Sequence, residues 1–176
     1  QLPRREFRMK KALFNIDDQY DFILIDNPQS LNLLTVNALA ASSGVIIPMQ
    51  CEYYALEGIS ALIGTIDKIN KRLNPELRIE GILRTMFDPR MSLTKDVSNH
   101  LVEYFGDKVY RTVIPRNVRL AEAPSHGLPA LLYDKNSRGS VAYLALAGEL
   151  IRKTNKASTE ASVPEQTEHQ QATQQD

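Results

Sequence analysis

Cysteine, tryptophan and long apolar runs are scarce or absent in this sequence. Its 176 residues include one cysteine, Cys51, and no tryptophan. A single cysteine excludes a disulfide framework and a zinc site built from cysteines, and it is typical of a reducing compartment such as the cytoplasm. The apolar runs have the length of β-strands and fall far short of the ~20 residues that a membrane-spanning helix needs. We therefore expect no membrane span.

Glycine is also sparse where a phosphate-binding loop would need it. The eight glycines stand apart from one another, and none precedes a Lys-Ser or Lys-Thr pair. A phosphate loop needs clustered glycines and a lysine, because backbone N–H groups and the lysine together surround the phosphate. Since the sequence also begins with Gln1 rather than methionine, we expect that an N-terminal portion, where such a loop would lie, is missing.

The charge is balanced overall, with 21 basic and 21 acidic residues, but it is unevenly placed. Residues 154–176 carry four acids and one base, which leaves 20 basic and 17 acidic residues in 1–153. The segment 154–176 has no Leu, Ile or aromatic residue, so it cannot bury enough apolar surface to order itself. We predict a folded domain over 1–153 and a disordered polar tail over 154–176. The small basic excess of the domain is weak support for a polyanionic partner, and a solvated surface is the simpler alternative.

Strand-like and helix-like patterns alternate along the chain. Short apolar runs bounded by Gly, Pro or acids predict strands at 20–26, 44–49, 79–86 and 109–114. Apolar residues at helical spacing predict helices at 4–14, 30–41, 56–73, 93–105 and 137–153, with Ser92 as the N-cap of the fourth. The last helix is expected to bury Val141, Leu144, Ala147, Leu150 and Ile151. This order predicts an α/β fold: a mostly parallel sheet with helices on both faces and ligands beyond the carboxyl ends of the strands.

Asp26 stands at the end of the first predicted strand. A carboxylate fixed there can hold the water shell of a Mg²⁺ ion beside a nucleotide. Taken alone, an acid at a strand end is more commonly a turn or cap residue. The pattern by itself leaves both roles open.

Several segments resemble the ParA/Soj family of chromosome- and plasmid-partitioning ATPases. They are YDFILID at 20–26, PMQCEYYALEG at 48–58, TMFD at 85–88, IPRNVRLAEAPSHG at 114–127, YD at 133–134 and SRG at 137–139. The resemblance covers roughly residues 5–152. It implies a P-loop NTPase fold of the deviant-Walker, ParA/MinD-like type. The chain looks like the C-terminal portion of that fold, without its first strand and its Walker A P-loop.

The resemblance implies a catalytic role for Asp26, as the Walker B aspartate that orients the water shell of Mg²⁺, with ATP and Mg²⁺ as cofactors. The family usually continues Asp-Cys/Thr-Pro-Pro-Ser, whereas this chain reads Asp26-Asn27-Pro28-Gln29-Ser30. Gln29 in place of the second proline restores a backbone N–H, so the turn that senses the γ-phosphate is expected to be looser.

The resemblance also implies a nucleotide site at the loops that flank adenine in the family. The corresponding residues are Met86, Phe87, Pro115, Arg116 and Asn117. Methionine and proline offer apolar contact to a base, and backbone groups can read its edge. The alternative for Met86 and Phe87 is a place in the core.

Arg90 and Arg119 correspond to arginines that contact DNA without sequence preference in the family. The forked and permanent charge of arginine suits phosphate. The alternative for each is a local salt bridge, for example between Arg119 and Glu122.

The function implied is that of an ATPase that forms an ATP-dependent homodimer on non-specific nucleoid DNA in the cytoplasm. A ParB-like centromere-binding protein would stimulate hydrolysis, and no membrane is involved, because the tail lacks an amphipathic stripe. Without a P-loop lysine, this chain alone is not expected to hydrolyse ATP. The alternative is a truncated, non-enzymatic paralogue that binds DNA or a partner as a regulator. We also expect marginal stability, because the strand at 20–26 would lack a neighbour.

Overall fold

One parallel sheet of three strands organises the chain. The computed structural model describes residues 4–28 and 30–161. The strands β1 (Gly44–Gln50), β2 (Arg78–Phe87) and β3 (Val109–Pro115) lie in the order β1-β2-β3, with both pairs parallel. These strands confirm three of the four predicted strands, and they confirm the α/β class.

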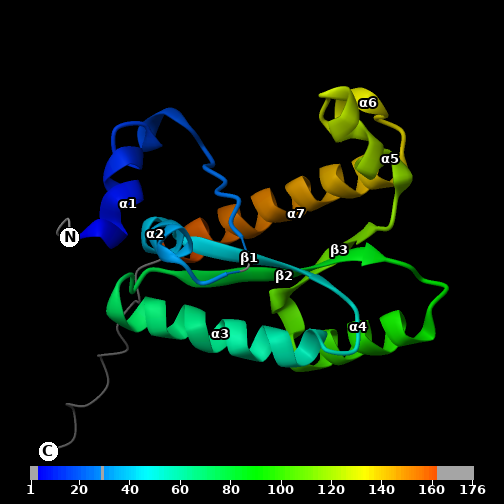
Figure 1. The fold of residues 1–176 in the computed structure, drawn as a ribbon, viewed down its shortest axis with the longest axis horizontal. Helices are drawn as coiled ribbons and strands as arrows, with labels where there is room; N and C mark the ends of the chain where they lie inside the picture. Colours follow the sequence, from blue (N-terminus) through cyan, green and yellow to red (C-terminus); the bar gives the residue numbers. More distant parts are fainter. Residues whose placement is uncertain (1–3, 29, 162–176) are drawn as a thin grey trace, which may run out of the picture.

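Helices precede, connect and follow the strands. The longer ones are α2 (Leu33–Ala41), α3 (Ala55–Arg72), α4 (Ser92–Phe105) and α7 (Arg138–Ala161). The shorter ones are α1 (Arg8–Leu13), α5 (Val118–Glu122) and α6 (Ala130–Tyr133), with 3₁₀ turns η1 (Arg5–Phe7), η2 (Asp17–Gln19), η3 (Gly106–Lys108) and η4 (Ala123–His126). Figure 1 shows α3 and α4 on one side of the sheet and α7 on the other, so helices cover both faces as predicted.

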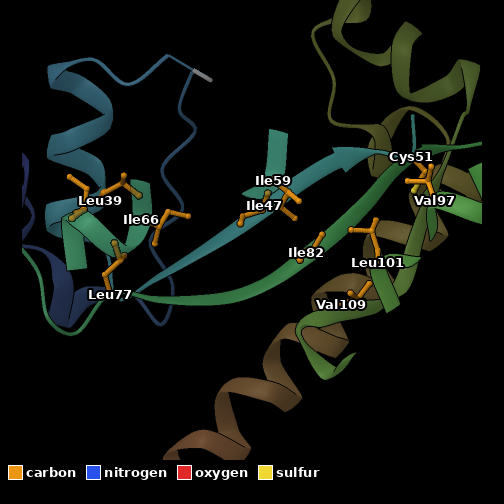
Figure 2. Close-up of a cluster of buried hydrophobic side chains, with 11 residues drawn as sticks. Leu39, Ile47, Cys51, Ile59, Ile66, Leu77, Ile82, Val97, Leu101 and Val109 are labelled. Carbon is orange, nitrogen blue, oxygen red and sulfur yellow. The ribbon is translucent and has the colours of Figure 1, made fainter. Parts of the chain in front are cut away.

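Alternating side chains of the strands pack into two hydrophobic cores, one on each face of the sheet. Ile47 of β1 and Ile82 of β2 point toward α3 and α4, where they pack in a cluster with Ile59, Ile66, Val97 and Leu101 (Figure 2). The next residue along β2, Leu83, packs on the opposite face with side chains of β3 and α7. Because successive side chains of a strand point to opposite faces, a strand buried on both faces reads as a continuous apolar run. This explains why the apolar residues Ile82 and Leu83 follow one another in β2.

The prediction of a strand at 20–26 is wrong. These residues form no ladder, and Tyr20, Phe22, Ile23 and Leu24 are exposed. A strand exists only where backbone N–H and C=O groups find a partner strand. Among the described residues, β1 pairs with β2 alone and no strand lies against 20–26, so the apolar pattern is present without the neighbour that would make it a strand.

Two helix starts and one helix end also differ from the prediction. Ser92 is the first residue of α4 rather than its N-cap, and no side chain caps that helix. The helix predicted from residue 30 begins at Leu33, because the Asn32 side chain accepts hydrogen bonds from the N–H groups of Leu34 and Thr35. Helix α7 continues to Ala161. Residues 154–161 are therefore helical, whereas the sequence predicted disorder from residue 154. The rest of the predicted tail, 162–176, lies outside the described residues, and the domain boundary stays a prediction.

The buried side of α7 is the other departure. Leu146 and Leu150 pack against the second core, whereas Val141, Leu144, Ala147 and Ile151 are exposed. The prediction was therefore right for Leu150 and wrong for the other four. Apolar residues surround much of α7, so the sequence spacing alone does not say which side meets the sheet.

The contrast between 20–26 and β2 predicts a contrast in stability. Leu24→Asp should change the free energy of unfolding by no more than about 0.5 kcal/mol, because the side chain is exposed. Ile82→Ala should lower it by about 2–5 kcal/mol, because Ile82 is fully buried. Urea denaturation followed by circular dichroism measures both values. An equal loss in the two variants would show that residues 20–26 pack in the folded chain.

Candidate nucleotide and DNA site

The end of β2 carries a bulge that redirects Met86. Arg84 pairs with Val113 and Phe87 with Pro115, so β2 has one residue more than β3 between these pairs. Met86 takes up this extra residue in the left-handed region, with φ 51°, which is rare for a residue other than glycine. Its side chain is 42% exposed. The bulge thus turns an apolar side chain outward at the predicted site.

A hydrogen bond joins the loops that follow β2 and β3. The N–H of Arg116 donates to the carbonyl oxygen of Phe87, 3.1 Å away. Phe87 itself packs against the core between the sheet and α3–α4, so its side chain has a structural role. The bond and the pairing of Phe87 with Pro115 bring the end of β2 beside the end of β3, and the nucleotide role of the residues there stays a prediction.

Asn117 carries an unpaired acceptor at this place. It stands at the N-cap of α5, where its side chain would ordinarily accept a bond from the helix, yet no such bond forms. Its Oδ1 is buried and has no hydrogen-bond partner among the described residues. A buried carbonyl oxygen without a donor is costly, so this atom is a candidate for a hydrogen bond to a bound group that brings a donor.

The end of β1 is held by two threonines. The Thr85 hydroxyl donates to the Met49 carbonyl at 3.3 Å, and the Thr94 hydroxyl to the Cys51 carbonyl at 3.5 Å. Burial raises the pKa of the Cys51 thiol, against the opposing effect of Arg84. Cys51 is therefore a core residue rather than a reactive thiol.

Arg90 is engaged in a local ion pair. Its Nε and Nη2 donate to the two carboxylate oxygens of Asp88 at 2.9 and 2.6 Å. Hydrogen bonds from the Arg90 side chain and backbone hold the pKa of the Asp88 carboxyl well below its usual range. The Arg90 side chain is still 87% exposed, so its remaining N–H donors face solvent.

Arg119 is likewise held by acids. Its Nη1 donates to Glu122 at 2.9 Å, and its Nε lies 3.5 Å from a carboxylate oxygen of Asp134. The Tyr133 hydroxyl donates to the same Glu122 carboxylate at 3.2 Å, and the Tyr133 ring stacks on His126. The local salt bridges that were the alternative for both arginines are thus present. Each bridge orients its guanidinium and partly neutralises its charge.

Asp26 lies in an exposed stretch of the chain. The neighbouring Asn27 side chain donates to the Ile25 carbonyl at 2.9 Å, and Gln29 lies outside the described residues. Among described residues, no group of three or more His, Cys, Asp or Glu gathers around a common point. A single exposed carboxylate suits contact with the water shell of Mg²⁺ rather than a cage of protein ligands.

Sequence reasoning passed over two residues beside this site. Arg84 and Glu149 are not among the predicted site residues, yet both bond to the backbone of β3. The signal was a charged residue inside an apolar strand and another inside an apolar helix. Neither signal indicates which backbone groups the charged side chain bonds to.

The fold resembles that of nucleotide-binding enzymes of known structure. Cobyrinic acid a,c-diamide synthase from Mycobacterium smegmatis, solved with bound ADP and magnesium, matches with a TM-score of 0.73 and 30% identity over 89% of this chain and 57% of that one. The cell division ATPase MinD from Pyrococcus furiosus matches with a TM-score of 0.65 and 21% identity over 86% of this chain and 59% of that one. The class is therefore that of the MinD/ParA-like P-loop NTPase folds. Within the described residues, no helix is both long and apolar enough to cross a membrane.

Sequence comparison narrows the class to a family. The sporulation initiation inhibitor protein Soj of Bacillus subtilis is 58% identical over 146 residues, which are 83% of this chain and 58% of that protein. The chromosome partitioning protein ParA of Caulobacter vibrioides is 48% identical over 164 residues, which are 92% of this chain and 61% of that protein. An uncharacterized protein of Pseudomonas putida is 65% identical over 89% of this chain and 60% of its own length.

A family model described as an AAA domain matches residues 1–79. The chain belongs to the ParA/Soj family of partitioning ATPases, as the sequence motifs suggested. It spans about 60% of the length of the curated relatives that it matches.

The left-handed backbone at Met86 predicts an unusual response to substitution. Met86→Gly should keep the free energy of unfolding close to that of the parent chain, whereas Met86→Val should lower it by about 1–2 kcal/mol, because a β-branched residue fits this region poorly. Met91→Val is the matched control, because Met91 is exposed in extended backbone with φ −88°. Chemical denaturation of the three variants tests this. Equal losses for Val at both positions would contradict strain at Met86.

Proposed function

We propose that this chain is the part of a ParA/Soj-type partitioning ATPase that holds the base of ATP and contacts non-specific DNA. Family membership supports the general assignment. The unpaired carbonyl of Asn117 is the structural observation that carries the nucleotide role.

Adenine suits the arrangement around Asn117. Its exocyclic amino group is a hydrogen-bond donor, which is what the buried Oδ1 lacks. Met86 and Pro115 border the same pair of loops and offer apolar contact to the flat base. Phe87 contributes through its carbonyl, which fixes the Arg116 backbone, rather than through its ring.

Asp26 is the residue in this chain that would hold Mg²⁺, through water. Bound Mg²⁺ neutralises charge on the phosphates during transfer. The chain contains no glycine-rich loop and lysine for the phosphates, so the proposal does not include hydrolysis by this chain alone. Phosphate release by the purified 176-residue chain would contradict that limit.

Arg90 and Arg119 are the proposed DNA contacts. Asp88 and Glu122 occupy part of each guanidinium and leave other N–H donors exposed. A guanidinium held on one side by a carboxylate presents its remaining donors in a fixed direction, which suits a phosphate. Because each arginine is partly neutralised, each contact is expected to be weak, and binding relies on several together.

The family resemblance extends this proposal to the whole protein. An ATP-dependent homodimer would bind nucleoid DNA without sequence preference, and a ParB-like centromere-binding protein would stimulate hydrolysis and release the DNA. High identity to Soj and ParA proteins supports this cycle. The cytoplasm is the expected compartment.

The nucleotide role predicts a preference for adenosine over inosine. Inosine carries a carbonyl oxygen where adenosine carries the amino group, so it would face the Asn117 carbonyl with a second acceptor. In NMR titrations, adenosine should shift the signals of Met86 and Asn117 and bind about tenfold more tightly than inosine. Asn117→Ala should abolish the preference, whereas Asn136→Ala, at an exposed asparagine, should keep it. Equal binding of both nucleosides by the parent chain would overturn the role of Asn117.

The DNA role predicts a change in salt dependence. The double variant Arg90→Ala/Arg119→Ala should weaken binding to duplexes of unrelated sequence to a similar degree. The slope of log K against log salt should fall in magnitude by about 2, about 1 for each lost phosphate contact. Arg72→Ala, at the exposed end of α3, is the control and should change neither. Fluorescence anisotropy at several salt concentrations gives both quantities, and an unchanged slope in the double variant would exclude these arginines.

A further inference from the structure

The guanidinium of Arg84 and the carboxylate of Glu149 both form hydrogen bonds with the backbone of β3. Arg84 of β2 donates from Nη2 to the carbonyl oxygens of Tyr110 and Arg111, at 2.8 and 3.2 Å. Its Nη1 donates to the Ser98 hydroxyl of α4 at 2.8 Å. Glu149 of α7 accepts from the N–H groups of Arg111 and Thr112, at 2.8 and 2.9 Å.

These bonds fall on the same two peptide groups. In the Tyr110–Arg111 peptide and in the Arg111–Thr112 peptide, the carbonyl oxygen meets Arg84 and the N–H meets Glu149. The two charges polarise each peptide in the same direction. Hydrogen bonds to charged groups are stronger than hydrogen bonds between neutral groups. We call this arrangement the β3 clamp.

The β3 clamp occurs where the ladder between β2 and β3 is irregular. Ile82 pairs with Val109 and Arg84 with Val113, so residues 110–112 of β3 lie opposite a single residue of β2. A regular ladder cannot satisfy the backbone groups of that stretch. Side chains from β2 and α7 satisfy these groups instead. They thereby fix the conformation of residues 110–112 and the position of the carboxyl end of β3 that follows.

The two charges have no direct ionic partner to explain them. Neither Arg84 nor Glu149 forms a salt bridge in the part of the chain that the structure describes. Burial lowers the pKa of Arg84, and Cys51 and Glu149 oppose that effect. The Arg84 Nε is buried without a partner among the described residues. Keeping two partly buried charges on a strand costs free energy, which points to a role in fixing the position of that strand.

The position of residues 110–112 determines the position of the site loop. β3 ends at Pro115, and Arg116 and Asn117 follow at once. Thr112 is three residues before Pro115, so a shift of the clamped stretch moves the Asn117 carbonyl. α7 crosses the sheet on the side where β3 meets the second core (Figure 1), so the same contact ties that loop to α7.

We propose that Arg84 and Glu149 are positioning residues for the loop Pro115–Asn117: by holding two peptide groups of β3 between them, they set where the Asn117 carbonyl lies and link it to α7. That Asn117 meets a nucleotide rests on the proposed function. The positioning itself does not, because it concerns backbone geometry in the free chain.

The test compares variants by NMR and amide hydrogen exchange without any ligand. Glu149→Ala should make the Arg111 and Thr112 amides exchange about tenfold faster and should shift the backbone and side-chain signals of Asn117. Glu149→Gln keeps one carbonyl oxygen at nearly the same size and should give an intermediate effect. It also tests the proposal if the alanine variant fails to fold. Arg84→Lys keeps the charge but not the fork, and it should also shift Asn117.

Glu103→Gln is the matched control, because Glu103 is exposed on α4. It should change neither the exchange at 111–112 nor the Asn117 signals. Signals of Ile47 in β1 report general loosening and should stay unchanged in every variant. Faster exchange at 111–112 with unmoved Asn117 signals would overturn the proposal, because the clamp would then be only local.

A final titration separates this proposal from the proposed function. If the parent chain binds adenosine, Glu149→Gln should weaken that binding several-fold without changing which residues shift. If the parent chain does not bind adenosine but Asn117 moves in the variants, the nucleotide role fails and the positioning role stands. If adenosine binds to the parent chain, and neither that binding nor the Asn117 signals change in the Glu149→Gln variant, the positioning role fails and the nucleotide role stands.

Discussion

The burial of β2 on both faces and both edges is the constraint on which the rest of the structure depends. It pairs with β1 on one side and β3 on the other, and its successive residues Ile82 and Leu83 enter different cores. Gly81 precedes them because a side chain there would collide with the Tyr110 ring, 2.5 Å from where a Cβ would stand. The following residues of the same strand, from Arg84 to Phe87, hold the end of β1, clamp β3 and carry the bulge. One strand therefore connects the core to the candidate site.

The two edges of the sheet are treated differently. At β3, Glu149 covers backbone N–H groups that an edge strand would otherwise leave free. At β1, no described strand or side chain takes an equivalent place, and Tyr20, Phe22, Ile23 and Leu24 in the preceding stretch are exposed. In the part of the chain that the structure describes, a helix thus closes the β3 edge, whereas the β1 edge stays open. An open edge beside exposed apolar residues is the feature expected to make the isolated chain prone to association.

Ion pairs around the candidate site act mainly on orientation. Exposed pairs such as Arg90–Asp88 and Arg119–Glu122 contribute little to stability, because water screens the attraction between the charges. Their effect on geometry is larger, since each carboxylate fixes the plane of a guanidinium. The Tyr133 hydroxyl and its stacking with His126 extend the second pair across α5, η4 and α6. This explains why that irregular stretch is held in place without a regular core of its own.

The sequence by itself determined the α/β class, three strands, the main helices and the family, because apolar periodicity and contiguous motifs are local properties of the chain. It also predicted that the ends of β2 and β3 lie side by side, because carboxyl ends of parallel strands share one edge of the sheet. Only the tertiary structure decided that 20–26 forms no strand, which side of α7 is buried, and that Arg84 and Glu149 meet across β3. Those outcomes depend on which partner a backbone group or side chain finds, and a partner far away in sequence leaves no local pattern.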